Sequence, residues 1–290
     1  MVVPALAAHC APVCDGAHGN GSIWKVEGAR GVVICVHDLA CCSQSYKKMA
    51  LFLNGQKFDV VACDIRELGC HQSPHGMRQW LNFSQSAAQL AALVSTNEQR
   101  HLPVYLLGEG LGADLALYVA INKGEKLRGL VLVNLPETFY KERSVLLKSA
   151  FGFVFRPNRR VVVSADGQRL ELMPAEAMSF SRAVRENAVA AIQGKKKTDM
   201  AVLYISGRKD PYSKQSSVLR LLKNFGTDRV LIESPDGHLL LENKPSDKLL
   251  PLVGSWLGNC QRGSVAVLLD NAGSSEIKKA GFKIVDPAAF

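Results

Sequence analysis

The chain has 290 residues, of which 47% are hydrophobic and 21% are charged. This composition excludes a disordered polar chain and suits one large globular α/β domain. No apolar run reaches the roughly 18 residues of a membrane-spanning helix, and the apolar first eight residues lack the basic segment of a signal peptide.

Residues 1–21 are rich in Ala, Gly, His and Cys and predict a flexible N-terminal tail. His9, Cys10, Cys14 and His18 could ligate zinc, but their spacing is not a standard zinc pattern, so we expect no metal site.

Alternating strands and helices predict the first part of an α/β core over residues 22–135, with right-handed crossovers and a mostly parallel sheet. Continuous apolar runs are typical of strands buried on both faces. The expected strands are 22–26, 31–37, 58–63, 104–107 and 130–133, and the expected helices are 45–53, 81–98 and 111–123.

Residues 136–199 interrupt this alternation of strands and helices and predict a cap inserted over the sheet. Strands at 161–163 and 169–172 around Asp166-Gly167 indicate a hairpin, and a helix is expected over 175–193. Twelve Lys or Arg against six Asp or Glu between 141 and 199 supply six of the chain's net charge of +9. Such an excess is typical of a solvated face, and it also favours peripheral contact with anionic lipid; no aromatic-interleaved basic motif points to nucleic acid.

The core resumes over residues 200–259. Here we expect strands at 202–206 and 229–233, the latter as the last core strand, and helices at 214–225 and 247–257. Residues 260–290 form a C-terminal extension, in which 265–269 is a candidate strand.

The chemistry centres on Gly108-Glu109-Gly110-Leu111-Gly112, between an apolar strand and a helical run. This pattern has the form of the nucleophile elbow G-x-S-x-G, in which flanking glycines let strand and helix approach closely. Gly110 stands where the serine is expected.

Two further residues complete the order nucleophile, acid and histidine that α/β-hydrolases use. Asp210 and His238 follow two later core strands. Either residue alone could be a helix cap or a surface loop residue, whereas their joint placement at strand ends favours an orienting carboxylate and a base.

On these residues the chain resembles the monoacylglycerol lipase and serine-aminopeptidase-like group of α/β-hydrolases over residues 23–257. The matching segments are His37-Asp38-Leu39 with Ser43 and Tyr46, 64–69 (D-I-R-E-L-G), 103–116, 207–210 and Gly237-His238. The resemblance implies an α/β-hydrolase fold, carboxylic esters of fatty acids, lysolipids or small alcohols as substrates, and oxyanion donors at the N–H groups of Leu39 and Leu111.

Three positions depart from the family pattern. Gly110 replaces the serine, so covalent acyl transfer through the elbow is excluded. Asp38 replaces the glycine of the oxyanion loop, and a carboxylate there would oppose a developing oxyanion. Glu67 replaces a glycine in the D-x-R-G loop. Because glycine adopts a positive φ without penalty, we expect Gly110 in that conformation, and we expect the turn to tolerate a serine at about 1–3 kcal/mol.

The same glycines also match the dinucleotide pattern G-x-G-x-x-A at Gly108, Gly110 and Ala113. This interpretation is less favoured, because the elbow is not the first βα unit and the next strand ends at Asn134 rather than at an acidic residue. It also leaves Asp210 and His238 unexplained.

Three functional hypotheses stay open. The first is a hydrolysis-impaired protein that binds a small acyl or lipid-like ligand. The second is a hydrolase in which His238, oriented by Asp210, activates water at the serine position. The third is an active serine-type esterase in which glycine at 110 replaces a natural serine. We expect no cofactor. Because Cys35 and Cys63 lie in expected buried strands, we expect reduced thiols and a cytoplasmic location, with membrane-peripheral contact through the basic cap.

Overall fold

The computed structural model describes most of the expected core. The described residues are 21–38, 41–64, 83–123, 127–135, 161–165, 168–172, 200–210, 229–237, 240–242, 247–261 and 281–285, with the single residues 183, 186, 213, 218 and 279. The expected tail, most of the expected cap, the helices at 175–193 and 214–225 and the candidate strand at 265–269 lie outside these residues, apart from isolated positions.

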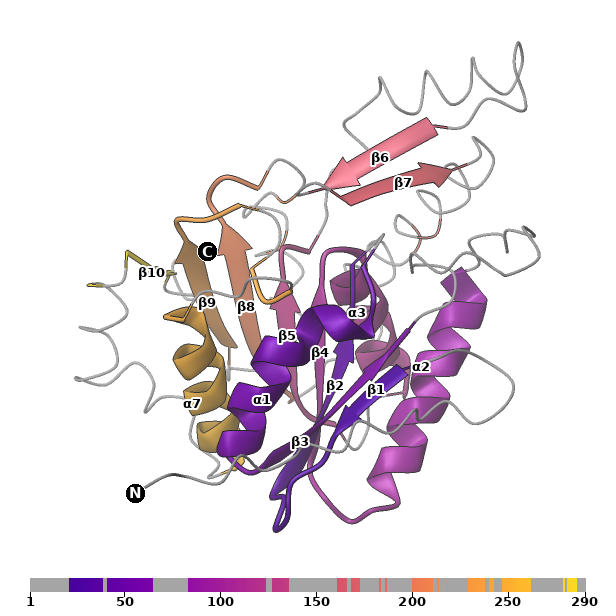
Figure 1. Cartoon of the computed structure of the whole chain (residues 1–290), viewed down its shortest axis with the longest axis vertical. Helices are drawn as coiled ribbons and strands as arrows, with labels where there is room; N and C mark the ends of the chain where they lie inside the picture. Colours follow the sequence, from indigo (N-terminus) through magenta and orange to yellow (C-terminus); the bar gives the residue numbers. More distant parts are fainter. Residues whose placement is uncertain are drawn as a thin grey trace.

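An eight-stranded sheet forms the centre of the molecule (Figure 1). Its spatial order is β1-β3-β2-β4-β5-β8-β9-β10, and the six inner strands pair in parallel, whereas β1 and β10 pair antiparallel at the two edges. The strands are β1 (Gly21–Trp24), β2 (Gly31–Val36), β3 (Phe58–Cys63), β4 (Val104–Glu109), β5 (Leu127–Val133), β8 (Ala201–Gly207), β9 (Arg229–Ser234) and β10 (Lys283–Val285). The predicted α/β fold class, with a mostly parallel sheet, is confirmed.

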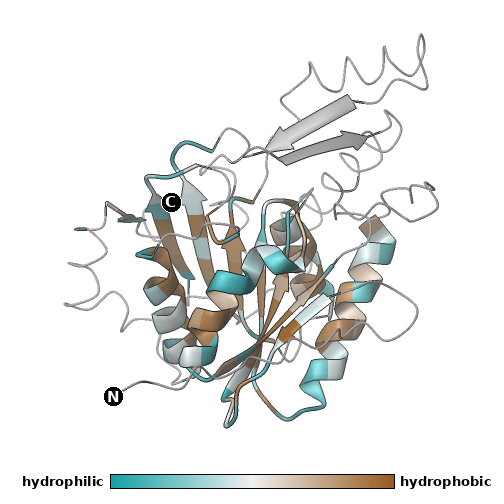
Figure 2. Ribbon diagram, viewed as in Figure 1, coloured by the Kyte–Doolittle hydropathy of each residue, from teal (hydrophilic) through white to brown (hydrophobic). Residues whose placement is uncertain are grey.

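Strands β2, β3, β4 and β8 are buried along their whole length because helices cover both faces of the sheet (Figure 2). The described helices are η1 (Ser43–Tyr46), α1 (Lys47–Gly55), α2 (Phe83–Glu98), α3 (Leu111–Lys123) and α7 (Leu249–Gln261). Alternate residues of β2 enter different clusters: Ile34 packs with residues of α2 and α3, whereas Cys35 packs with residues of α1 and α7. This alternation is the period of two that a strand imposes on its side chains.

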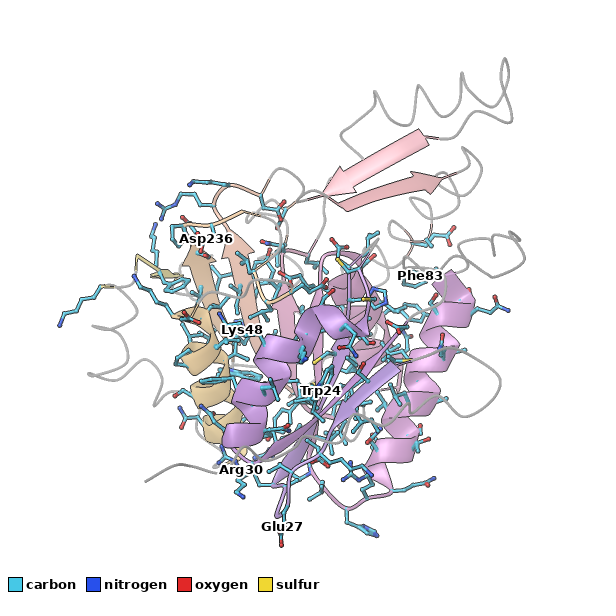
Figure 3. All side chains as sticks on the ribbon, in the orientation of Figure 1. Trp24, Glu27, Arg30, Lys48, Phe83 and Asp236 are labelled. Atoms are coloured by element: carbon cyan, nitrogen blue, oxygen red, sulfur yellow. The ribbon has the colours of Figure 1, made fainter. Side chains whose placement is uncertain are left out.

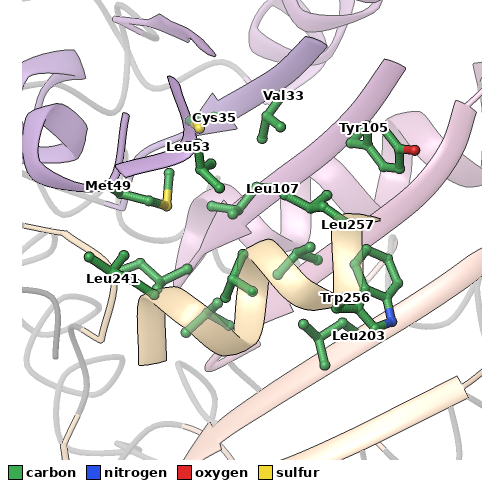
Figure 4. Packing of buried hydrophobic residues seen from close by; sticks show 14 of the residues in the cluster. Val33, Cys35, Met49, Leu53, Tyr105, Leu107, Leu203, Leu241, Trp256 and Leu257 are labelled. Atoms are coloured by element: carbon green, nitrogen blue, oxygen red, sulfur yellow. The ribbon is translucent and has the colours of Figure 1, made fainter. Parts of the chain in front are cut away.

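On the α1 and α7 side, large side chains close the core against the sheet. Trp256 of α7 is fully buried and lies beside Tyr105 and Leu203 (Figure 4). Aromatic side chains of this size bury a large apolar area and account for much of the packing free energy of a core. Helix α7 is thereby fixed against β4, β5 and β8, whose carboxyl ends carry the candidate site.

The predicted hairpin is confirmed as β6 (Val161–Ala165) and β7 (Gln168–Leu172), which pair antiparallel from Val161 with Leu172 to Ala165 with Gln168. In Figure 1 the hairpin lies on the side of the molecule toward which β8 points. That side is the one at which the parallel strands end.

The prediction that residues 229–233 are the last core strand is wrong. Residues 283–285 of the extension pair antiparallel with 231–233 and form the edge strand β10. A three-residue strand carries no recognisable periodicity, and its pairing depends on a chain reversal of some fifty residues, so sequence pattern alone does not reveal it. Among the described residues, no helix is long and apolar enough to cross a membrane.

Candidate functional site

The predicted site residues follow the carboxyl ends of β2, β4, β8 and β9, the edge at which open α/β sheets bind ligands. Figure 3 shows Asp236, just after β9, at the upper end of the molecule and Glu27 and Arg30 at the opposite end. Asp210, three residues beyond β8, is 8% exposed and closes a turn through its N–H to the carbonyl of Gly207 at 3.1 Å. His238 and Leu39 lie outside the described residues.

The elbow joins β4, which ends at Glu109, directly to α3, which begins at Leu111. Between them Gly110 has a φ of +54°, the left-handed region that glycine enters without strain. The flanking glycines lie at close backbone contacts: a β-carbon on Gly112 would lie 2.2 Å from the carbonyl oxygen of Val36, and one on Gly108 would lie 2.3 Å from the carbonyl oxygen of Gly112. The chain therefore has the tight strand-to-helix turn that presents a nucleophile in this type of elbow.

The space above Gly110 is taken by the side chain of Asp38, which follows β2. A β-carbon on Gly110 would lie 2.2 Å from Cγ of Asp38 and 2.3 and 2.4 Å from its two carboxylate oxygens. A β-carbon does not approach other heavy atoms this closely, so a serine at 110 requires the Asp38 side chain to leave its present position. The expected cost of about 1–3 kcal/mol for a serine in this turn counted only backbone strain, whereas a serine here would also have to displace the Asp38 carboxylate.

The Asp38 carboxylate also accepts a hydrogen bond from the predicted oxyanion donor. The N–H of Leu111, the first residue of α3, donates to Oδ1 of Asp38 at 2.7 Å. A helix N-terminus favours negative charge because its first N–H groups have no partner within the helix. The chain's own carboxylate uses this donor, so the expectation that Leu111 offers its N–H to a substrate oxyanion is wrong in this structure.

Two buried glutamates connect Asp38 and the elbow in a closed ring. The carboxylate of Glu109 accepts three successive N–H groups of residues 240–242, including those of Leu241 at 3.1 Å and Glu242 at 3.0 Å. Glu242 Oε1 accepts the N–H of Asp38 at 2.7 Å, and Asp38 accepts the N–H of Leu111. The elbow thus holds the loop after β9, that loop holds the loop after β2, and the loop after β2 returns to the elbow. We name this connection the carboxylate ring: Asp38, Glu109 and Glu242, which are 3%, 0% and 1% exposed.

Burial and like charge govern the titration of the groups around the ring. Desolvation, with the charges of Glu109 and Asp38, raises the pKa of Glu242 well above its ordinary value. Desolvation and the charge of Glu242 likewise raise the pKa of the Cys41 thiol and that of the Tyr46 phenol. The Tyr46 hydroxyl lies 3.1 Å from Glu242 Oε1 and 2.9 Å from the carbonyl oxygen of Val36. The Glu242 carboxyl therefore favours its proton more than an exposed glutamate does.

Asn134, the residue after β5, lies at the edge of the candidate site, although its place in the sequence indicated only a poor ribose ligand. Its Oδ1 accepts the N–H of Gly207 at 2.6 Å, and its Nδ2 donates to the carbonyl oxygen of Gly237 at 3.0 Å. The amide thereby connects the loop that carries Asp210 to the loop that precedes His238. The sequence signal for Asn134 is a polar residue at the end of a core strand. No sequence signal marks Glu242, because its role depends on the three-dimensional position of Asp38.

The remaining family-like position, Asp64 after β3, supports the loop after β2. Its carboxylate accepts the N–H of Ser43 and, at 3.1 Å, the Ser43 hydroxyl.

Among the described residues no group of three or more His, Cys, Asp or Glu side chains is arranged to hold a metal ion. The dinucleotide interpretation requires the first N–H groups of α3 for a pyrophosphate, and Asp38 already uses that of Leu111.

Comparisons with known proteins agree with the fold. The model of the serine aminopeptidase family S33 matches residues 27–150, and no curated protein matches the chain. A soluble variant of monoglyceride lipase from Saccharomyces cerevisiae, solved with a substrate analogue, is 13% identical and covers 85% of this chain and 93% of its own, with a TM-score of 0.70. A monoacylglycerol lipase from Paleococcus ferrophilus is 17% identical over 84% of this chain and 100% of its own, with a TM-score of 0.66. A thermostable carboxyl esterase from Bacillus coagulans, solved with glycerol, is 15% identical over 85% of this chain and 95% of its own, with a TM-score of 0.64.

Proposed function

We propose that this chain, whose fold resembles that of monoacylglycerol lipases and whose residues 27–150 match the serine aminopeptidase family model, binds a small acyl or lipid-like molecule without hydrolysing it. The ligand class follows from the resemblance. The loss of hydrolysis follows from the residues at the elbow.

The observation that carries this proposal is the carboxylate of Asp38 above Gly110. Losing the nucleophile of a triad removes ~10⁶ in kcat, and the residual ~10³ over water comes from substrate binding and the oxyanion donors. Removing one oxyanion donor costs about 10²–10³ more. Here the nucleophile is absent and the Leu111 N–H is bound to Asp38, so turnover close to the uncatalysed rate is expected.

The two catalytic alternatives conflict with the same side chain. A water activated by His238 would have to lie beside Gly110, where even a β-carbon would fall 2.2–2.4 Å from the Asp38 carboxylate. A natural serine at 110 would overlap that carboxylate unless the Asp38 side chain moved. Gly110 and Asp38 fit each other as a pair, which favours a binding protein over an esterase with a single isolated change.

We further propose that the basic segment between 141 and 199 contacts anionic membranes, and that the protein is cytoplasmic or membrane-peripheral. The support is the excess of six positive charges in that segment. A basic side chain near an anionic leaflet contributes about 1 kcal/mol, and the attraction fades within a Debye length.

The test of non-hydrolytic binding combines three measurements on the full chain. Calorimetry with 1-O-octylglycerol, an ether that cannot be hydrolysed, should give saturable binding. Hydrolysis of p-nitrophenyl butyrate should equal that of the matched control His238→Ala, and a fluorophosphonate probe should label no serine. A His238-dependent turnover, or stoichiometric labelling of a serine, would refute the proposal and establish an active hydrolase.

A further inference from the structure

The elbow of this chain has the parts of an anion site, and the chain supplies the anion itself. The N–H of Leu111 at the start of α3 is the donor, and the Asp38 carboxylate is held on it at 2.7 Å. Helix α3 has thirteen residues, so its N-terminus carries a full helix dipole. In a hydrolase of this fold, the same donor stabilises the negative charge that develops on the substrate.

The carboxylate ring keeps Asp38 on this donor. Glu242 binds the backbone N–H of Asp38 at 2.7 Å, and Glu242 is fixed in turn through its own N–H to Glu109 at 3.0 Å. All three carboxylates are at least nine-tenths buried. A bond between two fixed groups costs little conformational entropy, so Asp38 does not have to be ordered each time a ligand arrives.

The elbow therefore presents a hydrogen-bond acceptor where a hydrolase presents a nucleophile and a hydrogen-bond donor. A ligand that reaches the nucleophile position meets the Asp38 side chain in place of a serine hydroxyl and a free N–H group. Carboxylate oxygens accept hydrogen bonds and donate none. A second carboxylate at this position would face the Asp38 carboxylate, with no free donor from Leu111 and with repulsion between like charges in a site of low dielectric constant.

We propose that Asp38 is a built-in occupant of the oxyanion site and that the site consequently discriminates against carboxylate head groups, taking acyl-chain ligands whose head group is uncharged and donates a hydrogen bond. This inference rests on the proposed non-hydrolytic binding and adds to it the class of head group. A primary alcohol satisfies it, whereas the free fatty acid that ester hydrolysis would release does not.

The first experiment tests the occupied anion site without any acyl ligand. Asp38→Gly and Asp38→Ala remove the internal carboxylate, and Asp38→Asn is the matched control because its amide oxygen fills the same space without charge. We expect sodium acetate, compared with sodium chloride at equal ionic strength, to raise the melting temperature of the Gly and Ala variants selectively, because a ligand that binds only the folded state stabilises it. Wild type and Asp38→Asn should show no acetate-specific shift. Two variants are used so that one of them suffices if the other does not fold.

The second experiment measures the affinities of 1-octanol and octanoate for wild type and Asp38→Asn, at concentrations where both ligands are monomeric. We expect the octanol-to-octanoate affinity ratio of wild type to exceed that of Asp38→Asn by about tenfold or more, since only wild type opposes a second carboxylate. Equal ratios would overturn the proposed discrimination, and so would an acetate effect that is the same in wild type and in the Gly and Ala variants. If neither ligand binds any variant, the proposed acyl-ligand function fails, while the acetate experiment still decides whether Asp38 occupies an anion site.

Discussion

Replacing both Gly110 and Asp38 should convert the elbow into a working esterase, whereas replacing Gly110 alone should not. The single change Gly110→Ser puts a β-carbon 2.2 Å from Cγ of Asp38, so it must expel that side chain. It also puts a residue with a β-carbon at a φ of +54°.

The cost of the single change can be added from its parts. A non-glycine residue in the left-handed region costs about 1–3 kcal/mol, and leaving the buried N–H of Leu111 without its acceptor costs about 1–3 kcal/mol. We therefore expect Gly110→Ser to lower the free energy of unfolding by roughly 2–6 kcal/mol. Asp38→Gly removes the overlapping carboxylate and frees the Leu111 N–H for a substrate, so the double variant should be less strained at the elbow.

The assay is hydrolysis of p-nitrophenyl butyrate by wild type, both single variants and the double variant, with His238→Ala in the double background as the control. The double variant has regained a nucleophile, worth up to ~10⁶ in kcat, and one oxyanion donor, worth about 10²–10³. We expect His238-dependent turnover in the double variant that exceeds that of either single variant. Urea denaturation of Gly110→Ser that matched wild type, together with activity equal to that of the double variant, would refute the steric argument for Asp38.

Further predictions follow from the ring, the core and the basic segment. Burial and neighbouring carboxylates raise the pKa of Glu242 in the folded chain, so its contribution to stability is fully present at low pH and is lost as pH rises through the raised pKa. Glu242→Gln should therefore gain stability relative to wild type as pH rises. A difference in melting temperature between the two proteins that does not change with pH would contradict this. Iodoacetamide should modify the half-buried Cys42 of the native protein well before the adjacent Cys41, whose burial raises its pKa, and mass spectrometry showing equal rates would refute that order. Trp256→Ala should lower the free energy of unfolding by about 3–5 kcal/mol in urea titrations, because the side chain is fully buried in the core, and a loss below 1 kcal/mol would mean that α7 is not packed as described. Changing the lysines at 195–197 to glutamate should weaken sedimentation with anionic vesicles at low salt, whereas equal binding of wild type to neutral and anionic vesicles would reject the membrane contact.

The core strands and the elbow could be predicted from the sequence because their signals are local. Residues 31–36 and 201–205 are uninterrupted apolar runs, as is typical of strands buried on both faces. The alternate glycines at 108, 110 and 112 mark the strand-to-helix turn because a β-carbon at each of them would overlap a neighbouring atom. Short or polar elements gave weaker signals: η1 was merged into the helix that follows it, and β10 was missed.

Sequence by itself determined that a nucleophile is absent at 110, since that conclusion needs only the identity of one residue in a recognised turn. It also placed Asp38 near the oxyanion position, but only as a departure from the family pattern that is unrelated to the one at Gly110. Only the tertiary structure decided that Asp38 and Gly110 complement each other, because it brings the Asp38 side chain over the α-carbon of a residue 72 positions away in the chain. The ring through Glu109 and Glu242 needed the same information, since buried carboxylates find their N–H partners across loops that fold together at one edge of the sheet.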